Sequence, residues 1–394
     1  MTATLLHLSD WLLWVVLAVS VAYVVFFALI SLLPPQLPPN KPKGEDTAVP
    51  TLPSFLVLFP AYHEDGVILN SVTSFLQQDY PADRYEVAVI SDHIAADVNR
   101  QLAALPITLH QPQFEHSSKA RALQYAMSKS EGKSFDAVVI LDADNVAGTD
   151  LLRRLAMLRA EGRHAIQCHR TAKNADSDVA VLDGVSEEIN NTIFRRAHNR
   201  AGLSSALIGS GMCFDHAWFA RAVHQLSTAG EDRELEALLL KERIFVYYAD
   251  DLLVMDEKVG SADNFQRQRL RWMSAQVNSL LTMLPYVPRA IVTGNIGYLD
   301  KTLQQALVPR SMLLVLTAAI AIVLLPLAPL RSIKWWLLLL LLTAAITIAI
   351  PRRLRSRTLL AKAMLLPQLV WRMLCNIGHI DARNKNFIHT QHAQ

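Results

Sequence analysis

The sequence predicts an α/β domain with a mostly parallel, Rossmann-like sheet, flanked at both ends by transmembrane helices. Between about residues 52 and 271, short β-rich runs alternate with helical stretches, as in a parallel sheet covered on both faces by helices. Apolar runs without charged residues lie near both ends of the 394-residue chain. Hydrophobic residues make up 52% of the sequence and the mean hydropathy is +0.22, which is high for a soluble enzyme.

Charge and cysteine content exclude several classes of protein. The formal net charge of +3 gives no basis for a nucleic-acid partner. Cys168, Cys213 and Cys375 lie far apart and lack the spacing of metal ligands. A zinc site or a disulfide framework is therefore not expected, and the cysteines fit a reducing compartment.

The first apolar run, Trp11 to Leu33, has the length of a membrane-spanning helix. No basic residue precedes it, which disfavours a signal peptide. A proline-rich stretch then predicts a short stiff linker, and Lys41 and Lys43 follow. Because basic residues favour the cytoplasmic side, we expect the N-terminus outside and the following domain in the cytoplasm.

Two further apolar runs, Met312 to Leu330 and Trp335 to Ile350, predict a transmembrane hairpin with Arg331 to Lys334 as its turn. Four arginines between residues 352 and 357 follow and should be cytoplasmic. Residues 359–380 are apolar but carry charges, so we favour an interfacial helix over a further span. The chain is thus expected to be a multi-pass protein of the plasma (inner) membrane.

Within the middle region, strands are expected at residues 55–59, 85–90, 107–110 and 137–141, and helices at 67–78, 117–128 and 150–159. Polar clusters follow the first, second and fourth of these strands, at residues 61–65, 91–93 and 142–145. Ligands of open parallel sheets bind beyond the carboxyl ends of the strands. The clusters therefore mark the expected site.

The sequence of residues 138–144 places two carboxylates, Asp142 and Asp144, at the end of a buried strand. Mg²⁺ and Mn²⁺ prefer oxygen ligands, and one or two carboxylates combined with substrate phosphates make a usual site. The alternative is a solvated turn whose aspartates cap a helix.

Two other motifs carry polar groups that suit chemistry. Glu231 and Asp232 precede a helix over residues 233–242, where acidic residues also serve simply as a helix cap. Gln268, Arg271 and Trp272 share one face of a helical stretch over residues 263–281. An amide, a guanidinium and an indole on one face suit a sugar or a diphosphate, or else an interfacial helix that faces lipid headgroups.

Taken in order along the chain, these motifs resemble the membrane-bound family-2 glycosyltransferases of the GT-A fold, which include cellulose, chitin and hyaluronan synthases and ceramide glucosyltransferases. The resemblance covers about residues 50 to 285. It rests on residues 59–64, 78–81, 91–92, 142–144, 209–211, 231–232 and 268–272. The chain departs from common family patterns at Gly230, His63 and His93, which leaves sugar and acceptor specificity open.

The resemblance implies a role for each motif. Asp92 would contact the base or ribose of a nucleotide sugar, Tyr62 and Glu64 would line the nucleotide, and Lys119 would help to hold it. Asp142 and Asp144 would bind the diphosphate and Mg²⁺ or Mn²⁺, with Asp144 the direct ligand. Asp232 would be the general base. The acceptor and departing diphosphate would lie near Gly209, Ser210, Gly211, Glu231, Gln268, Arg271 and Trp272.

The implied activity is inverting transfer from a nucleotide-diphosphate sugar, with a UDP-sugar favoured, to a growing β-linked polysaccharide. Single transfer to a lipid acceptor is the main alternative, and an inactive membrane scaffold is remote. Three spans are few for a polymer channel, so a homo-oligomer or an accessory export protein could complete one. Membrane lipids are expected partners. The tail at residues 387–392 resembles a segment that approaches the active site in some relatives.

These interpretations divide the chain into six parts. Residues 1–34 form a transmembrane anchor and residues 35–51 a linker. Residues 52–260 form the GT-A domain. Residues 261–300 form an interfacial region that contains residues 268–272, the QxxRW motif. Residues 301–358 form the transmembrane hairpin, and residues 359–394 an interfacial or membrane helix with a cytosolic tail.

Overall fold

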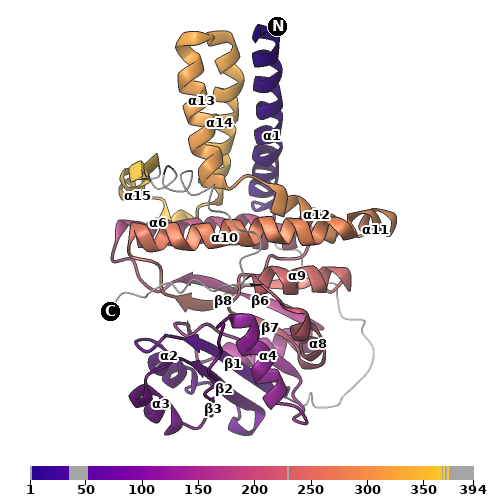
Figure 1. The fold of residues 1–394 in the computed structure, drawn as a ribbon, viewed down its shortest axis with the longest axis vertical. Coiled ribbons are helices and arrows are strands. Elements are labelled where there is room, and N and C mark those ends of the chain that lie inside the picture. Colours follow the sequence, from indigo (N-terminus) through magenta and orange to yellow (C-terminus); the bar gives the residue numbers. More distant parts are fainter. Residues whose placement is uncertain (1, 35–51, 229, 366, 369–370, 372–394) are drawn as a thin grey trace.

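The computed structural model describes residues 2–34, 52–228, 230–365, 367–368 and 371. Helices α1 (Thr2–Ile30), α13 (Arg310–Leu327) and α14 (Pro329–Ala349) stand upright above α10 (Ala262–Met283), which lies across them, and the sheet domain lies below α10 (Figure 1). The predicted linker over residues 35–51, most of the ambiguous 359–380 segment and the 387–392 tail fall outside the described residues. The fold therefore consists of an apolar helical part, a lateral helix and an α/β domain.

The α/β domain is built on one eight-stranded sheet with the order β3-β2-β1-β4-β7-β6-β8-β5. Its strands are β1 (Phe55–Tyr62), β2 (Tyr85–Asp92), β3 (Thr108–His110), β4 (Ala137–Ile140), β5 (Val146–Ala147), β6 (Ala165–Ala172), β7 (Met212–Asp215) and β8 (Val246–Asp256). Strands β1 to β4 are mutually parallel, as are β6 and β8, whereas β7 runs antiparallel to β4 and β6. The predicted mostly parallel, Rossmann-like sheet is confirmed.

Alternate residues of β1 enter two separate cores because successive side chains of a strand point to opposite faces. Phe55, Val57 and Phe59 pack with α2 (Ile68–Phe75), α3 (Ala96–Ala103) and α5 (Leu151–Ala160). Leu56 and Leu58 pack with α4 (Lys119–Lys129), α8 (His216–Ala222) and α9 (Glu231–Lys241). Burial on both faces explains why β1 and β4 are continuous apolar runs in the sequence.

The four predicted strands and the predicted helices at residues 67–78, 117–128 and 150–159 are all present, with ends that differ by a few residues. The second half of the sheet, β5 to β8, was not predicted. Neither was α6 (Asp178–Asn190), which continues into the π-helical turn η2 (Asn191–Arg196) and α7 (Ala197–Arg200). The short 3₁₀ turns are η1 (Ala82–Arg84) and η3 (Val223–Gln225).

Among the residues that the structure describes, three helices are long and apolar enough to cross a membrane. They are α1 (Thr2–Ile30), α13 (Arg310–Leu327) and α14 (Pro329–Ala349). The expected hairpin turn at Arg331 to Lys334 is wrong, because these residues lie inside α14 and the two helices meet at Ala328. Within α14, Lys334 pairs with Asp10 of α1, so its charge does not require a solvent-exposed loop.

An ion pair joins α1 to α14 at the end remote from the sheet. Lys334 Nζ lies 2.6 Å from Asp10 Oδ2, and Trp335 Nε1 donates to Asp10 Oδ1 at 3.0 Å. The Lys334 ammonium also lies 4.0 Å from the centroid of the Trp11 ring. Both charges are thus satisfied within the helical bundle.

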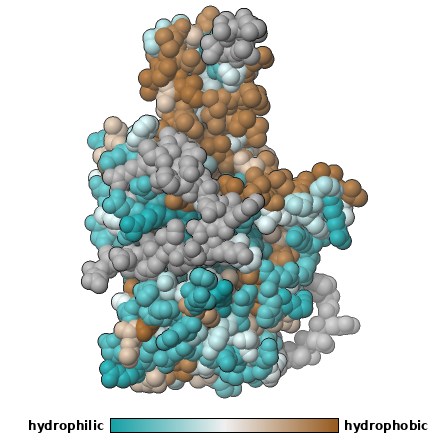
Figure 2. Space-filling view, viewed as in Figure 1, coloured by the Kyte–Doolittle hydropathy of each residue, from teal (hydrophilic) through white to brown (hydrophobic). Residues whose placement is uncertain are grey.

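A lateral arm separates the upright helices from the sheet. It comprises α10 (Ala262–Met283), η4 (Leu284–Tyr286), α11 (Val287–Val292) and α12 (Ile296–Ala306). Large apolar side chains, among them Val292 and Ile296, are exposed on it. Figure 2 shows that this apolar surface continues from the upright helices onto the arm. The chain then ends, within the described part, in η5 (Arg352–Leu354), α15 (Arg357–Lys362) and η6 (Ala363–Leu365).

Replacing Asp10 with Ala is expected to lower the free energy of unfolding by about 1.5–3 kcal/mol, since a hydrogen-bonded charge loses its partner. The measurement is the thermal unfolding midpoint in detergent. The double variant Asp10→Ala/Lys334→Met should recover part of the loss, because no unpaired charge remains. Equal midpoints for wild type and Asp10→Ala would contradict the role of the pair.

Candidate active site

The predicted polar clusters meet at the carboxyl ends of β1, β2 and β4. In the parallel register, Tyr62 lies beside Asp92, and Leu58 lies beside Ile140. Asp142 and Asp144 directly follow β4. The three strands are neighbours and end at one edge of the sheet. The side chains of Tyr62, Asp92, Asp142 and Asp144 therefore lie at one site.

The β1–β2 corner is lined by Asp92 and three rings. The Asp92 carboxylate is almost fully buried, and its Oδ1 lies 2.6 Å from His93 Nδ1. The rings of Tyr62, His63 and His93 lie 4.4–5.7 Å from one another between centroids. His63 and His93 both have a φ of 56°, an uncommon backbone conformation that often marks functional loops. Glu64 follows on the same loop, and its carbonyl accepts from the amide of Ile68.

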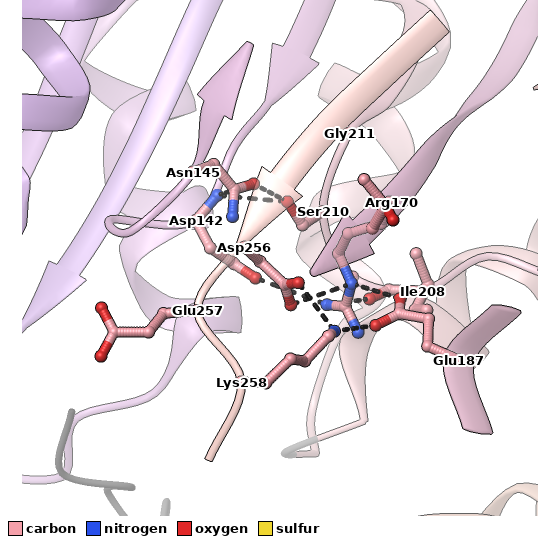
Figure 3. Close-up of polar contacts among 12 residues, drawn as sticks. Asp142, Asn145, Arg170, Glu187, Ile208, Ser210, Gly211, Asp256, Glu257 and Lys258 are labelled. Atoms are coloured by element: carbon pink, nitrogen blue, oxygen red, sulfur yellow. Dashed lines mark hydrogen bonds and ion pairs between the residues drawn. The ribbon is translucent and has the colours of Figure 1, made fainter. Parts of the chain in front are cut away.

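A hydrogen-bonded loop holds the two carboxylates that follow β4. Asn145 accepts from the backbone amide of Asp142 at 3.0 Å, and it also accepts from the Ser210 hydroxyl. Asp144 Oδ1 accepts from Asn145 Nδ2 at 2.9 Å, and Asp144 Oδ2 accepts from the Glu257 amide at 2.9 Å. Figure 3 shows Asn145 turned toward Ser210 beside Asp142. These contacts fix the orientation of the Asp144 carboxylate and the position of the Asp142 backbone.

These two carboxylates fit a hard divalent cation whose coordination shell is completed by a bound ligand. Among the described residues, no group of three or more His, Cys, Asp and Glu side chains forms a metal site. A protein site of one or two carboxylates suits Mg²⁺ or Mn²⁺ only when phosphate oxygens and waters fill the remaining positions. The donor set thus agrees with a cation that arrives together with a diphosphate.

Lys119, the first residue of α4, connects the carboxylates of the site. Its ammonium pairs with Asp142 Oδ1, lies 3.5 Å from Glu231 Oε1, and donates to the Gly209 carbonyl at 2.6 Å. Burial alone would lower the pKa of Lys119, but the carboxylates of Asp142 and Glu231 outweigh burial and raise it. Lys119 therefore stays protonated beside these carboxylates.

The glycines at 209 and 211 allow the chain to pass through this crowded region. Gly209 has a φ of 84°, and a Cβ there would lie 3.5 Å from Glu231 Oε1 and 3.7 Å from Lys119 Nζ. Gly211 has a φ of 62°, and a Cβ there would meet Cys168 Cβ at 3.2 Å. Left-handed backbone and close approach both favour glycine at these positions.

Helix α9 presents Glu231 and Asp232 on its first turn, opposite Lys119. Burial raises the pKa of Glu231 to about 7, and the neighbouring Asp232 and Asp142 add to this against the opposing charge of Lys119. Arg271 of α10 faces the same group: burial lowers its pKa, while Glu231, Asp142 and Asp232 oppose that change. Three carboxylates and two cations thus converge from four elements.

Two predicted residues have a different environment from the rest. Trp272 stacks with Arg269, whose guanidinium lies 4.3 Å from the indole centroid. Gln268 Oε1 is buried without a hydrogen-bond donor. For neither residue does the described part of the chain show a contact with the carboxylate cluster. Their predicted role at a sugar stays a prediction.

Sequence reasoning missed a buried charge network beneath the Asp142 loop (Figure 3). Arg170 Nε lies 2.7 Å from Glu187 Oε1 and 3.2 Å from Asp256 Oδ2. Lys258 pairs with Glu187 and lies 2.7 Å from Asp256 Oδ1, and Arg170 Nη1 lies 4.0 Å from Asp142 Oδ2. A charged residue within the buried run of β6 was the available signal.

The raised pKa of Glu231 predicts a dependence of stability on pH. A carboxyl that holds its proton more tightly when folded stabilises the fold fully below its ordinary pKa of 4.5, and this contribution is lost as the pH rises toward about 7. Glu231→Gln should therefore flatten the fall of the unfolding midpoint between these pH values. The exposed Glu242→Gln serves as control, and identical pH profiles for Glu231→Gln and wild type would refute the assignment.

Comparisons with known proteins agree with this fold. A mannosyltransferase from Pyrobaculum calidifontis, solved with GDP-Man and Mn²⁺, shares the fold with a TM-score of 0.53 at 18% identity, covering 92% of this chain and 99% of that one. An N-acetylglucosaminyltransferase of Neorhizobium galegae is 24% identical over 63% of this chain, and the match spans 60% of that protein. A beta-monoglucosyldiacylglycerol synthase of Synechocystis is 27% identical over 38% of this chain and 32% of its own length.

The family assignment follows from a match over the whole sheet domain. The family model described as glycosyltransferase-like family 2 matches residues 53–275, which is more than half of the chain. This region contains every strand and the cluster around Lys119. The chain therefore belongs to the glycosyltransferase-like family 2.

Proposed function

We propose that the protein transfers a sugar from a nucleotide-diphosphate sugar to an acceptor hydroxyl at the membrane surface, with inversion of configuration. The observation that carries the proposal is the convergence of Asp142, Glu231 and Asp232 on Lys119 and Arg271 at the edge of the sheet nearest the lateral arm. Carboxylates there can bind a cation and take up a proton, and the two cations suit a leaving diphosphate.

The donor would lie across the β1–β2 corner and the Asp142 loop. Asp92 would accept from the base or ribose, and Tyr62 and Glu64 would line the nucleotide. Lys119 would face the diphosphate. We favour a UDP-sugar, and screening UDP- and GDP-sugars with the purified full chain in lipid nanodiscs tests this assignment.

A divalent cation, Mg²⁺ or Mn²⁺, would be held by Asp144 and Asp142. When bound, it would supply Lewis-acid stabilisation of the charge on the leaving diphosphate. The hydrogen-bonded carboxylate of Asp144 supports the proposal, and the solved mannosyltransferase of the same fold contains Mn²⁺. The protein's own cations, Lys119 and Arg271, would share this neutralisation.

In the proposed reaction, Asp232 removes the proton of the acceptor hydroxyl as its oxygen bonds to the anomeric carbon. The bond from that carbon to the diphosphate oxygen breaks, and the nucleoside diphosphate leaves with the electron pair. One displacement inverts the anomeric centre, so an α-linked donor gives a β-linked product. Asp232 ends the step protonated.

For the acceptor, the sequence favoured a growing β-linked polysaccharide, and a lipid was the alternative. The described residues contain three candidate spans, which suits an acceptor that lies in the membrane and needs no channel. One relative is a beta-monoglucosyldiacylglycerol synthase by name, which points the same way. We therefore propose a lipid acceptor first and retain the polysaccharide as the second candidate. Product size after turnover separates the two.

The membrane placement is part of the proposal. Residues 261–300, with Gln268, Arg271 and Trp272 on α10, would lie at the bilayer surface, and residues 52–260 would form the cytoplasmic catalytic domain of an inner-membrane protein. The apolar surface that continues from the upright helices onto the arm supports this placement (Figure 2).

Asp232→Asn is expected to reduce turnover by about 10²–10⁴-fold, the typical contribution of general-base catalysis, while leaving the Kd of the donor nucleotide unchanged. Rates of sugar transfer and equilibrium binding of the nucleotide provide the two measurements. Glu242→Gln, at the far end of the same helix, should behave like wild type. Normal turnover by Asp232→Asn would show that another group is the base.

Asp144→Ala is expected to abolish the response of turnover to added Mg²⁺ or Mn²⁺, because one carboxylate ligand of the cation is lost. Activity is titrated against each metal for wild type and for the exposed control Asp83→Ala. Wild-type turnover that persists in excess chelator would overturn the metal assignment.

A further inference from the structure

Three arginines lie between the active site and the base of the upright helices, outside the groups used above. Arg195 belongs to η2, Arg269 to α10, and Arg310 is the first residue of α13. Arg195 is only 4% exposed, the Arg269 side chain is 13% exposed, and Arg310 is half-buried. Their partners lie close together on α6 and at the start of η2, between residues 183 and 191, so the three guanidinium groups are neighbours.

All three arginines are anchored on successive turns of α6 and η2. Arg269 pairs with Asp183, and Arg310 donates to the Ser186 carbonyl at 3.0 Å and to Asn190 Oδ1 at 2.6 Å. Positions 183, 186 and 190 recur at helical spacing and face one side. Arg195 donates to Asn191 Oδ1 at 2.9 Å. The partners of Arg269 and Arg310 thus share one face of α6, and the partner of Arg195 follows at the start of η2.

Of these three arginines, Arg269 alone forms an ion pair within the described residues, with Asp183. Within the described part of the chain, neither Arg195 nor Arg310 forms an ion pair with a carboxylate, and their side-chain acceptors are neutral amides. The Nε atoms of Arg195 and Arg269 are buried without an acceptor. Burial lowers the pKa of Arg195 to about 10, which leaves it charged at neutral pH. A buried charge without an ionic partner is costly, so an anion bound beside Arg195 and Arg310 would stabilise them.

We propose that Arg195, Arg269 and Arg310 bind the phosphate group of a membrane lipid. Guanidinium groups match phosphate oxygens through paired charge-assisted hydrogen bonds. Arg310 starts a candidate membrane span, and α13 rises from the level of α6 and α10 (Figure 1), so a headgroup can reach the site from the bilayer.

The site also extends toward the chemistry. Arg195 lies within the electrostatic reach of Asp232 and Glu236 on α9. A lipid held by its phosphate here would therefore carry its headgroup hydroxyls toward the proposed base. In this respect the inference rests on the proposed function and refines it, since an anionic phospholipid becomes the acceptor class.

The test measures binding of dioctanoyl phosphatidylglycerol, dioctanoylglycerol and inorganic phosphate to the full chain in detergent. Phosphatidylglycerol should bind at least about tenfold more tightly than dioctanoylglycerol, given the strength of hydrogen bonds between charged groups. Arg310→Gln and Arg195→Gln should each remove about that factor, whereas Arg310→Lys should lose less. The exposed Arg352→Gln, just after α14, should bind like wild type.

Equal binding of the two lipids, or an unchanged Kd in both glutamine variants, would overturn the site. Inorganic phosphate that binds as tightly as phosphatidylglycerol would overturn the assignment to a lipid. UDP binding is measured on the same samples: retained binding shows that a variant is folded. If the wild-type protein does not bind UDP, the proposed donor is contradicted, while the lipid result remains valid.

Discussion

The arrangement of the whole molecule depends on the acidic side chains buried along α6. Asp183, Glu187 and Glu188 are all nearly inaccessible, and helix α6 lies between the sheet and the upright helices. A carboxylate in such a place is tolerated only when it is paired. Each of the three therefore requires a cation from another layer, and these pairings fix where the layers lie.

The partners come from every neighbouring element. Arg170 of β6 and Lys258 beyond β8 form ion pairs with Glu187, and Arg269 of the lateral arm forms one with Asp183. Glu188 is shared by His169 of β6 and by Arg353, which follows the upright hairpin. Burial would lower the pKa of His169, but its hydrogen bonds to Asp250 and Glu188 outweigh burial and raise it to about 9. The sheet, the arm and the hairpin are thus bound to one helix by charge, and a shift of one layer would unpair another.

This constraint also explains which parts were accessible from the sequence. Strands β1, β2 and β4 were predictable because burial on both faces makes them continuous apolar runs, and Asp92 and Asp142 follow them directly. Helix α6 was not predictable, because its acids resemble a solvated surface until their partners are known. Those partners lie up to 165 residues away, as for Glu188 and Arg353. The Lys334 prediction failed for the same reason, since its partner Asp10 is 324 residues away.

The position of α9 relative to the upright helices follows from a second set of long-range contacts. Tyr23 of α1 contacts both His198 at 2.8 Å and Asp300 of α12 at 2.9 Å. The next residue, Lys301, is fully buried and lies 3.2 Å from Glu236 of α9. Helix α9 carries Asp232, so a short chain of buried polar contacts joins the proposed base to an upright helix. Such a link would hold the proposed base at a fixed distance from the upright helices. That arrangement suits an acceptor whose hydroxyl lies at one depth in the bilayer.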